Sequence, residues 1–339
     1  MAKILVTGAS GFIGFHLTRA LLEQGHEISC LVRKSSKLDR LAGLPIRRAD
    51  GDVTDAESLR HVVPGHDAVY HLAGLVKAIH VQQLYQVNRD GVANLARACA
   101  AQTTPPVLLV VSSLAAMGPS SPQRPRVESD PPAPVSNYGR SKLAGEQAAR
   151  QWAKEVPITI LRPPIVFGEC DSATYEIFRP IARCGVHVVP CWRPPWVSLI
   201  HADDLLQAMI LAAQRGKRIL CDPVDGIAAA QGCYFARAER DVTLAEMGRM
   251  MGAALGRRRT CVLRLGPFWV WTVGLIATAF SQLRGQAWYF NLDKAREARA
   301  GCWTCSGQAA ARELGFAVTV PLEERLSQTA HWYREHGWL

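Results

Sequence analysis

A tyrosine and a lysine four positions apart, Tyr138 and Lys142, have the spacing to move a proton together. Residues i and i+4 of a helix share a face, so the ammonium can lie beside the phenol. Tyrosine is a poor base at its ordinary pKa of about 10, but a nearby cation favours the phenolate and lowers that pKa. The pair predicts acid–base chemistry at an alcohol or carbonyl. A hydroxyl must also bind the substrate oxygen, and Ser113 ends an apolar run where such a group belongs, with adjacent Ser112 as the alternative.

A glycine-rich turn near the start of the chain predicts a nucleotide site. Gly8, Gly11 and Gly14 follow the apolar run 4–6 and precede helical periodicity over 15–24. In this context, backbone N–H groups and a helix N-terminus can approach a pyrophosphate. The spacing G-x-x-G-x-x-G departs from the common G-x-G-x-x-G. A Tyr-x-x-x-Lys pair alone is usually a surface pair, but together with this turn it indicates a nucleotide-dependent redox enzyme.

The residue at the position expected to contact the adenine ribose is basic. Arg33 lies nineteen positions after Gly14, where an acidic residue would bind the 2′-hydroxyl of NAD. Lysine and two serines follow at 34–36, and no acid occurs between Glu27 and Asp39. Cations and hydroxyls suit a 2′-phosphate. NADP is therefore the favoured cofactor, and NAD is usable if Arg33 only stacks on the adenine.

The elements that must position these residues alternate between two periodicities. Short apolar runs indicate buried strands at 4–6, 27–33, 46–49, 68–72, 107–113 and 158–161. Helical stretches are expected at 15–24, 54–63, 84–101 and 136–153, and Thr54 with Glu57 has the spacing of a capping box. Apolar runs that alternate with helices predict an α/β fold, a Rossmann-type doubly wound parallel sheet.

The pattern changes after residue 167 and predicts a second, smaller unit. We expect residues 1–167 to form a dinucleotide-binding Rossmann domain, to which 197–215 return. Residues 168–196 and 216–339 should form a C-terminal substrate-binding lobe over the carboxyl edge of the sheet, where ligands bind in such folds. The lobe is expected to contain an irregular stretch at 170–195, a strand at 196–200, a capped helix at 243–255 and an amphipathic helix at 321–338.

The charge and composition of the chain limit the classes of partner that we expect it to bind. The net charge of +10 suits nucleic acid, an anionic membrane surface or an anionic cofactor. The chain has no lysine-rich tail and no zinc-finger spacing, so no nucleic-acid partner is expected. It has no signal-peptide pattern, so we expect a cytoplasmic protein with reduced cysteines. Cys302 and Cys305 form a C-x-x-C pair without two further ligands, so they are expected to be packing residues and no metal is expected.

One uncharged apolar stretch, 266–280, lies between Arg257–Arg259 and Arg284 and contains two tryptophans. Fifteen helical residues span about 22 Å, which is short of the roughly 30 Å hydrocarbon core, so a transmembrane helix is not expected. Two interpretations stay open. The segment is either a buried lobe helix that lines an apolar pocket, or a peripheral contact with the inner face of a membrane.

The chain resembles the extended short-chain dehydrogenase/reductase superfamily of the NAD-dependent epimerase/dehydratase type over nearly its whole length. The matching segments are 7–14, 51–54, 71–74, 87–88, 111–113, 138–142, 161–164 and 201–204. Within the superfamily it is most similar to the bacterial branch related to 3β-hydroxysteroid dehydrogenases and dihydroflavonol reductases, whose C-terminus resembles residues 332–338.

The resemblance implies roles for individual residues. Tyr138 would be the proton donor or acceptor, Lys142 its activator and Ser113 the ligand of the substrate oxygen. Asn88 would have a structural or relay role, and a helix cap is favoured over a catalytic role for 201–204. The implied cofactor-binding residues are Gly8, Ser10, Gly11, Phe12, Ile13, Arg33, Asp52, Val53, Leu72, Ala73, Gly74, Tyr138, Lys142, Pro163 and Val166.

The expected activity is the interconversion of a secondary alcohol and a ketone on a hydrophobic, ring-containing substrate such as a 3β-hydroxysteroid or sterol. A sterol 4-carboxylate would yield a β-keto acid, which loses carbon dioxide readily. A nucleotide-sugar epimerase is the first alternative, although Leu114 and Ala115 stand where related sugar dehydratases have an acidic pair. A non-catalytic NADP-sensing protein is the second, although such relatives usually lose the tyrosine or lysine kept here. A homodimer is expected.

Overall fold

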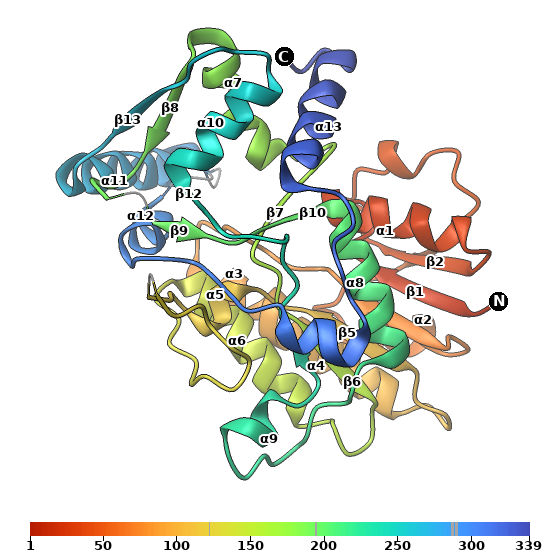
Figure 1. The fold of residues 1–339 in the computed structure, drawn as a ribbon. Coiled ribbons are helices and arrows are strands. Elements are labelled where there is room, and N and C mark those ends of the chain that lie inside the picture. Colours follow the sequence, from red (N-terminus) through yellow and green to blue (C-terminus); the bar gives the residue numbers. More distant parts are fainter. Residues whose placement is uncertain (122, 194, 286–287, 289–290) are drawn as a thin grey trace.

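The computed structural model describes residues 1–121, 123–193, 195–285, 288 and 291–339 (Figure 1). A seven-stranded sheet of order β11-β6-β5-β4-β1-β2-β3 forms its centre, and all neighbouring strands pair in parallel. The strands are β1 (Lys3–Thr7), β2 (Glu27–Val32), β3 (Arg47–Asp50), β4 (Ala68–His71), β5 (Val107–Val111), β6 (Ile158–Leu161) and β11 (Cys233–Tyr234). This order is that of a doubly wound dinucleotide-binding fold with one added edge strand, which confirms the predicted fold class.

Helices cover both faces of the sheet because its strands are apolar on both sides. On one face, α1 (Phe12–Glu23), α8 (Ala202–Arg215) and η3 (Ala310–Leu314) share an apolar core with the strands. The other core contains residues of α2 (Ala56–Val62), α4 (Gly91–Ala100) and α6 (Asn137–Arg150). The short elements η1 (Asp39–Leu41), α3 (Val81–Tyr85), η2 (Gln86–Asp90), α5 (Leu114–Met117) and α9 (Gly226–Ala230) connect them.

The smaller lobe comes from chain on both sides of α8. Its strands form three two-stranded ribbons, β7 with β10, β9 with β12 and β8 with β13. Phe178, Met247, Met251, Leu326 and Tyr333 belong to its own apolar core. Its elements are β7 (Ile165–Phe167), α7 (Ser172–Cys184), β8 (Val186–Val189), β9 (Trp196–Val197), β10 (Leu199–His201), β12 (Val242–Thr243), α10 (Leu244–Ala254), β13 (Cys261–Arg264), α11 (Pro267–Arg284), α12 (Leu292–Arg299) and α13 (Leu322–Glu335).

The irregular stretch expected at 170–195 is wrong, because α7 and β8 occupy most of it. Asp171 caps α7 by accepting hydrogen bonds from the N–H groups of Ala173 and Thr174, each at 3.0 Å. Gly185 ends the helix in the left-handed region at φ 69°. Pro180 lies inside the helix, where proline is ordinarily destabilising. Burial of one apolar face of α7 in the lobe core overrides that local preference. Pro194, also in this stretch, lies outside the described residues.

Two further differences concern how the chain crosses between the units. The single strand expected at 196–200 is two short strands, β9 and β10, which pair with β12 and β7 instead of the seven-stranded sheet. Conversely, β11 lies in the segment 216–339 expected for the lobe, yet it pairs with β6 at the edge of the main sheet. Short strands thus pair in a different unit from the one expected for their segment. They have too few residues to show a periodicity in the sequence.

Candidate active site

The helix that carries Tyr138 and Lys142 lies unusually close to its neighbours. A Cβ atom on Gly145 of α6 would fall 2.1 Å from the carbonyl oxygen of Asn88, so only glycine permits this approach. A Cβ on Gly139 would lie 2.3 Å from the carbonyl oxygen of Ala115, in the segment that follows Ser113. These two glycines therefore allow α6 to pack closely against η2 and against the segment that follows β5.

Lys142 reaches from α6 to the end of β5. Its ammonium group donates a hydrogen bond to the carbonyl oxygen of Val111 at 2.6 Å. Burial of the ammonium lowers the pKa of Lys142 to about 8, although Glu146 acts in the opposite direction. A Cβ on Gly74 would lie 3.6 Å from the same nitrogen, so the ammonium borders the loop after β4. The lysine therefore lies where a bound nucleotide and the phenol could both contact it.

Ser113 and Ser112 point to different surroundings because successive residues of an extended chain alternate in direction. Ser112 is buried and lies beside Glu146. Burial raises the pKa of Glu146, but Arg162 and Ser112 more than offset this effect and lower it. Ser113 is only half-buried and accepts a hydrogen bond from the N–H of Ala115 at 3.1 Å. Of the two hydroxyls, that of Ser113 has the more accessible position.

The start of α6 is held by a helix that the sequence did not connect with it. Asp293 of α12 accepts hydrogen bonds from the backbone N–H groups of Asn137 and Tyr138, at 2.8 and 3.0 Å. Ser136 donates to the carboxylate of Glu297 at 2.5 Å and accepts from the N–H of Gly139 at 2.9 Å. Negative groups at a helix N-terminus are stabilising. Two carboxylates of α12 therefore position the first turn of the catalytic helix.

A second lysine lies near the phenol. The ammonium group of Lys294, also on α12, is 5.4 Å from the centre of the Tyr138 ring. It donates to the carboxylate of Glu297 at 2.6 Å. Sequence reasoning missed these three residues, Asp293, Lys294 and Glu297, because contacts across more than 150 residues leave no local signal.

Asn88 acts as a brace between the nucleotide loop and the catalytic helix. Its amide group donates to the carbonyl oxygen of Leu75 and to the hydroxyl of Ser141, both at 2.9 Å. Its carbonyl oxygen accepts from the N–H of Leu75 at 2.9 Å. Ser141 in turn donates to the carbonyl oxygen of Tyr138 at 2.7 Å. This geometry fits the structural role that the resemblance implied.

A pocket over the carboxyl ends of β1, β2 and β4 collects most of the residues predicted to bind the cofactor. Gly8 adopts φ 75°, and a Cβ there would lie 2.7 Å from the backbone nitrogen of Ala73. The turn therefore packs directly against the loop after β4. The predicted residues that line the pocket are Gly8, Ser10, Gly11, Arg33, Asp52, Val53, Leu72, Ala73 and Gly74.

Other predicted residues lie outside this lining, and some lining residues were missed. Phe12 and Ile13 begin α1, directly after the glycine turn. Tyr138, Lys142, Pro163 and Val166 belong to α6 and to the chain from the end of β6 into β7. The pocket also contains Leu31, Ser36, Gly51, Leu75 and Val87. Of these, Ser36 is one of the hydroxyls singled out from the sequence, and Gly51 and Val87 lie in segments matched to the superfamily. Leu31 and Leu75 were missed, although Leu75 directly follows Gly74.

The pocket lining includes both an exposed cation and a carboxylate. Arg33 is exposed, and its backbone N–H donates to the hydroxyl of Ser36 at 3.0 Å, which folds the loop 33–36 into a turn. The carboxylate of Asp52 accepts from the N–H and hydroxyl of Thr54, both at 2.9 Å. One wall thus carries the arginine, and another carries Asp52 and Val53.

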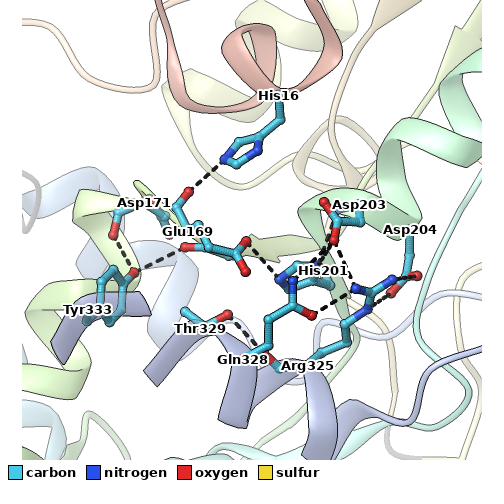
Figure 2. A network of polar contacts seen from close by, with 11 residues as sticks. His16, Glu169, Asp171, His201, Asp203, Asp204, Arg325, Gln328, Thr329 and Tyr333 are labelled. Carbon is cyan, nitrogen blue, oxygen red and sulfur yellow. Dashed lines mark hydrogen bonds and ion pairs between the residues drawn. The ribbon is translucent and has the colours of Figure 1, made fainter. Parts of the chain in front are cut away.

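His201 caps α8, and Asp203 and Asp204 lie in the first turn of that helix, within a wider polar network (Figure 2). The ring of His201 accepts from the N–H of Asp203 at 3.3 Å. Arg325 of α13 donates to Asp203 at 2.9 Å and to both carboxylate oxygens of Asp204, at 2.7 and 3.2 Å. The network ties the C-terminal helix to the start of α8.

Glu169 extends this network towards α1. Its backbone carbonyl oxygen lies 2.9 Å from a ring nitrogen of His16, and its carboxylate lies 3.3 Å from His201. Burial raises the pKa of Glu169, but His201 more than offsets this and lowers it to about 2. Glu169, His201 and Asp203 have ligand atoms within 4.8 Å of one another, yet the guanidinium of Arg325 already neutralises Asp203.

The C-x-x-C pair has separate packing contacts. Cys302 accepts a hydrogen bond from the N–H of Trp196 at 3.4 Å. Burial raises the pKa of the Cys305 thiol to about 12. Both thiols are free and buried, which fits their expected role as packing residues.

The family follows from a match over about the N-terminal two thirds of the chain. Residues 4–221 match the model of the NAD dependent epimerase/dehydratase family. The chain belongs to this family. It is therefore an NAD(P)-dependent oxidoreductase of the epimerase/dehydratase type. Among the residues that the structure describes, no helix combines the length and apolar character needed to cross a bilayer.

Relatives of this family member include enzymes named for lipids. The chain is 31% identical to a ceramide reductase of Caulobacter vibrioides, over 99% of this chain and 96% of that protein. It is 26% identical to a putative dihydroflavonol 4-reductase of Synechocystis, over 98% and 95%. It is 25% identical to a 3-beta-hydroxysteroid dehydrogenase of Mycolicibacterium neoaurum, over 76% and 71%.

Solved structures show the same fold. A UDP-glucose 4-epimerase from Thermotoga maritima superimposes with a TM-score of 0.77 at 19% identity, covering 98% of this chain and 99% of that one. A dTDP-glucose 4,6-dehydratase from Streptomyces venezuelae with NAD bound gives 0.75 at 21%, covering 99% and 98%. At these identities the likeness establishes architecture alone.

Proposed function

We propose that this family member interconverts a secondary alcohol and a ketone on a large hydrophobic lipid, with NADP(H) as the favoured cofactor. The observation that carries the proposal is the placement of three groups on adjoining elements beside the nucleotide pocket. Ser113 follows β5, Tyr138 begins α6, and Lys142 bonds the last residue of β5. In the proposed mechanism these three groups bind and protonate the substrate oxygen.

The chemistry follows from the protonation of these groups. The nicotinamide cofactor, when bound, supplies the hydride for reduction or accepts it for oxidation. In reduction, the hydroxyl of Ser113 donates a hydrogen bond to the substrate carbonyl oxygen, and the phenol of Tyr138 gives that oxygen its proton. In oxidation, the tyrosinate takes the alcohol proton back. The ammonium of Lys142 favours the tyrosinate, since a nearby cation stabilises a phenolate.

The lipid class rests on the names of the relatives. Relatives named as a ceramide reductase and a 3-beta-hydroxysteroid dehydrogenase share one substrate feature, a secondary alcohol on a large apolar molecule. A sterol demethylase protein B of Methylococcus capsulatus, 28% identical over 63% of this chain and 66% of that protein, supports the sterol end of this range. We therefore propose ceramide-type and ring-containing sterol substrates ahead of nucleotide sugars.

A turnover panel tests the proposal. Full-length protein is assayed with NADPH and the ketone form of ceramide, with NADP⁺ and a 3β-hydroxysterol, and with UDP-glucose. Turnover of a lipid and no turnover of the sugar is the expected result. Epimerisation of UDP-glucose without lipid turnover would overturn the proposal in favour of a sugar epimerase.

The NADP preference has its own test at Arg33. Arg33→Asp removes a cation from the pocket wall and places a negative charge beside a 2′-phosphate. A hydrogen bond to a charged group contributes about 1.5–3 kcal/mol, so the ratio of NADPH to NADH affinity should fall by about tenfold or more. Arg47→Asp is the matched control, because Arg47 is exposed and lies on β3 outside the pocket lining. An unchanged ratio in fluorescence titrations would remove Arg33 from the cofactor site.

A further inference from the structure

The outward face of α11 is apolar over most of its length. Phe268, Trp269, Leu275, Ile276 and Leu283 are each between 59% and 85% exposed. The buried interpretation of 266–280 is therefore wrong for these side chains. Figure 1 places α11 at the edge of the smaller lobe, on the opposite side of the molecule from β1 and β2.

The inward face of the same helix carries small residues. Gly274, Ala277 and Ser281 are buried, and a Cβ on Gly274 would lie 3.1 Å from the Cβ of Ala295 in α12. A surface helix of a globular protein ordinarily turns its large apolar side chains inward. α11 has the opposite arrangement, since small residues let it pack closely on α12 while the large ones face outward.

The hydroxyl groups of α11 do not make its outward face polar. Thr272 donates to the carbonyl oxygen of Phe268 at 2.9 Å, and Thr278 donates to that of Gly274 at 2.8 Å. A protein interface ordinarily carries about one hydrogen bond per 100–200 Å². A face whose hydroxyls already bond their own helix is better suited to a partner that requires no such bonds.

The charged residues of the segment that contains α11 are all positive. Between Glu246 and Asp293 the sequence contains no Asp or Glu, but it contains six arginines. Arg258, Arg259 and Arg264 are exposed on the approach to α11, and Arg284 is exposed at its end. An apolar helix face with a cationic border complements a surface that is apolar beneath a layer of anionic groups.

We propose that α11 inserts its outward face into the interface of a membrane that contains anionic lipids, with its axis in the plane of the membrane. The arginines at its two ends would contact the lipid phosphates. A bilayer fits this surface better than a second copy of the chain, because two copies would bring like-charged arginines together. The inference agrees with a lipid substrate but does not depend on one, since binding to vesicles is measured without turnover.

Co-sedimentation of the full-length protein with vesicles tests the proposal. The vesicles are phosphatidylcholine alone or phosphatidylcholine with about a third phosphatidylglycerol. Wild type should bind the anionic vesicles more tightly, and the double variant Ile276→Glu with Leu283→Glu should bind them at least about tenfold more weakly. Arg258→Gln should weaken binding to the anionic vesicles alone, by about fivefold for one cation.

The matched control places the same charges on another exposed apolar site. Val224→Glu with Ile227→Glu changes two residues that are 93% and 79% exposed in and just before α9, and this variant should bind like wild type. Melting curves should be unchanged for both variants, because their side chains are exposed. Equal, weak sedimentation of wild type with both vesicles would overturn the proposal. So would a dimer that the α11 variant converts to monomer in sedimentation equilibrium, since α11 would then be an interface between copies.

Discussion

Tyr138 is the residue whose hydroxyl the proposed mechanism needs, and Tyr138→Phe removes that atom alone. Turnover should fall by about 100- to 10,000-fold, the usual contribution of a general acid or base. Cofactor affinity should be nearly unchanged, because the substitution removes only the acid–base hydroxyl and keeps the ring. Steady-state rates and NADPH titrations check both points. Tyr175→Phe in α7 is the control, and a Tyr138→Phe enzyme with more than half of the wild-type rate would contradict the assignment.

Lys142 links function to stability. Burial lowers its pKa from 10.5 to about 8 in the folded protein. Between pH 8 and 10.5 the unfolded chain binds more protons than the folded protein, so the stability of wild type rises with pH across that window. Below pH 8 the folded protein bears the full cost of burying a charged ammonium. Lys142→Met removes the penalty but leaves the Val111 carbonyl oxygen without its donor. The net gain in the free energy of unfolding at neutral pH should be on the order of 2 kcal/mol.

Urea unfolding at about pH 7 and pH 9.5 measures this effect. The stability difference between Lys142→Met and wild type should shrink at the higher pH, because the folded wild-type lysine is then neutral. Turnover should be lost at both values. If Lys142→Met were less stable than wild type by the same amount at both pH values, burial of the charged Lys142 ammonium would not destabilise the folded protein.

At the scale of elements, α12 completes the catalytic helix. Asp293→Ala leaves two N–H groups at the start of α6 without their acceptor, which should cost about 0.5–2 kcal/mol and displace Tyr138. Asp55→Ala is the matched control, because Asp55 caps α2, outside the residues of the proposed mechanism. Both variants should lose similar stability in urea, but only Asp293→Ala should lower kcat. Asp293→Asn should restore kcat only in part, because its single amide oxygen can accept from one of the two N–H groups that bind the two carboxylate oxygens. Equal values of kcat for the two alanine variants would show that Asp293 stabilises the start of α6 without positioning Tyr138.

Local signals predicted elements well and their ends less well. The cap expected for the helix at 243–255 is confirmed at Thr243, which accepts from the N–H of Glu246 at 3.1 Å, while the carboxylate of Glu246 pairs with Arg240 and does not complete a capping box. The capping box expected at Thr54 is wrong: Asp55 caps α2, while the hydroxyl of Thr54 donates to Asp52. Both residues are good caps, and only the fold of the preceding loop decides between them. Most of the sheet was predictable because its central strands carry apolar runs, but the two-residue edge strand β11 carries too short a run to be found.

The smaller lobe was less predictable because its organisation is long-range. Its strands are two to four residues long, too short to show an alternation. Ser136 caps α6 locally, but the acceptor for the N–H groups of Asn137 and Tyr138 comes from a helix about 155 residues later. The nucleotide pocket was largely predictable because a glycine turn and the ends of neighbouring strands form it. The surroundings of Tyr138 were not.

At the scale of the whole molecule, Arg325 joins the C-terminal helix to α8. Arg325→Met leaves the carboxylate of Asp204 buried and unpaired, so the free energy of unfolding should fall by about 3–5 kcal/mol. Arg240→Met is the control. Arg240 forms ion pairs with Glu246 and Glu323 that are substantially exposed, and its loss should cost about 1 kcal/mol or less. Urea denaturation of both variants makes the comparison, and equal losses would mean that the network in Figure 2 contributes no more than a surface pair.

The cap that α12 places on α6 also sets an order of events during synthesis. Tyr138 and Asp293 are separated by 155 positions. A ribosome that adds about 5–20 residues per second needs roughly 8–30 s to make that stretch. Throughout this interval the nascent chain contains the tyrosine, the lysine and the glycine turn, but the catalytic helix lacks its last ligands. The enzyme can therefore reach its working geometry only after α12 has been made, and a chain stopped before α12 would lack the two carboxylates that hold the start of its catalytic helix.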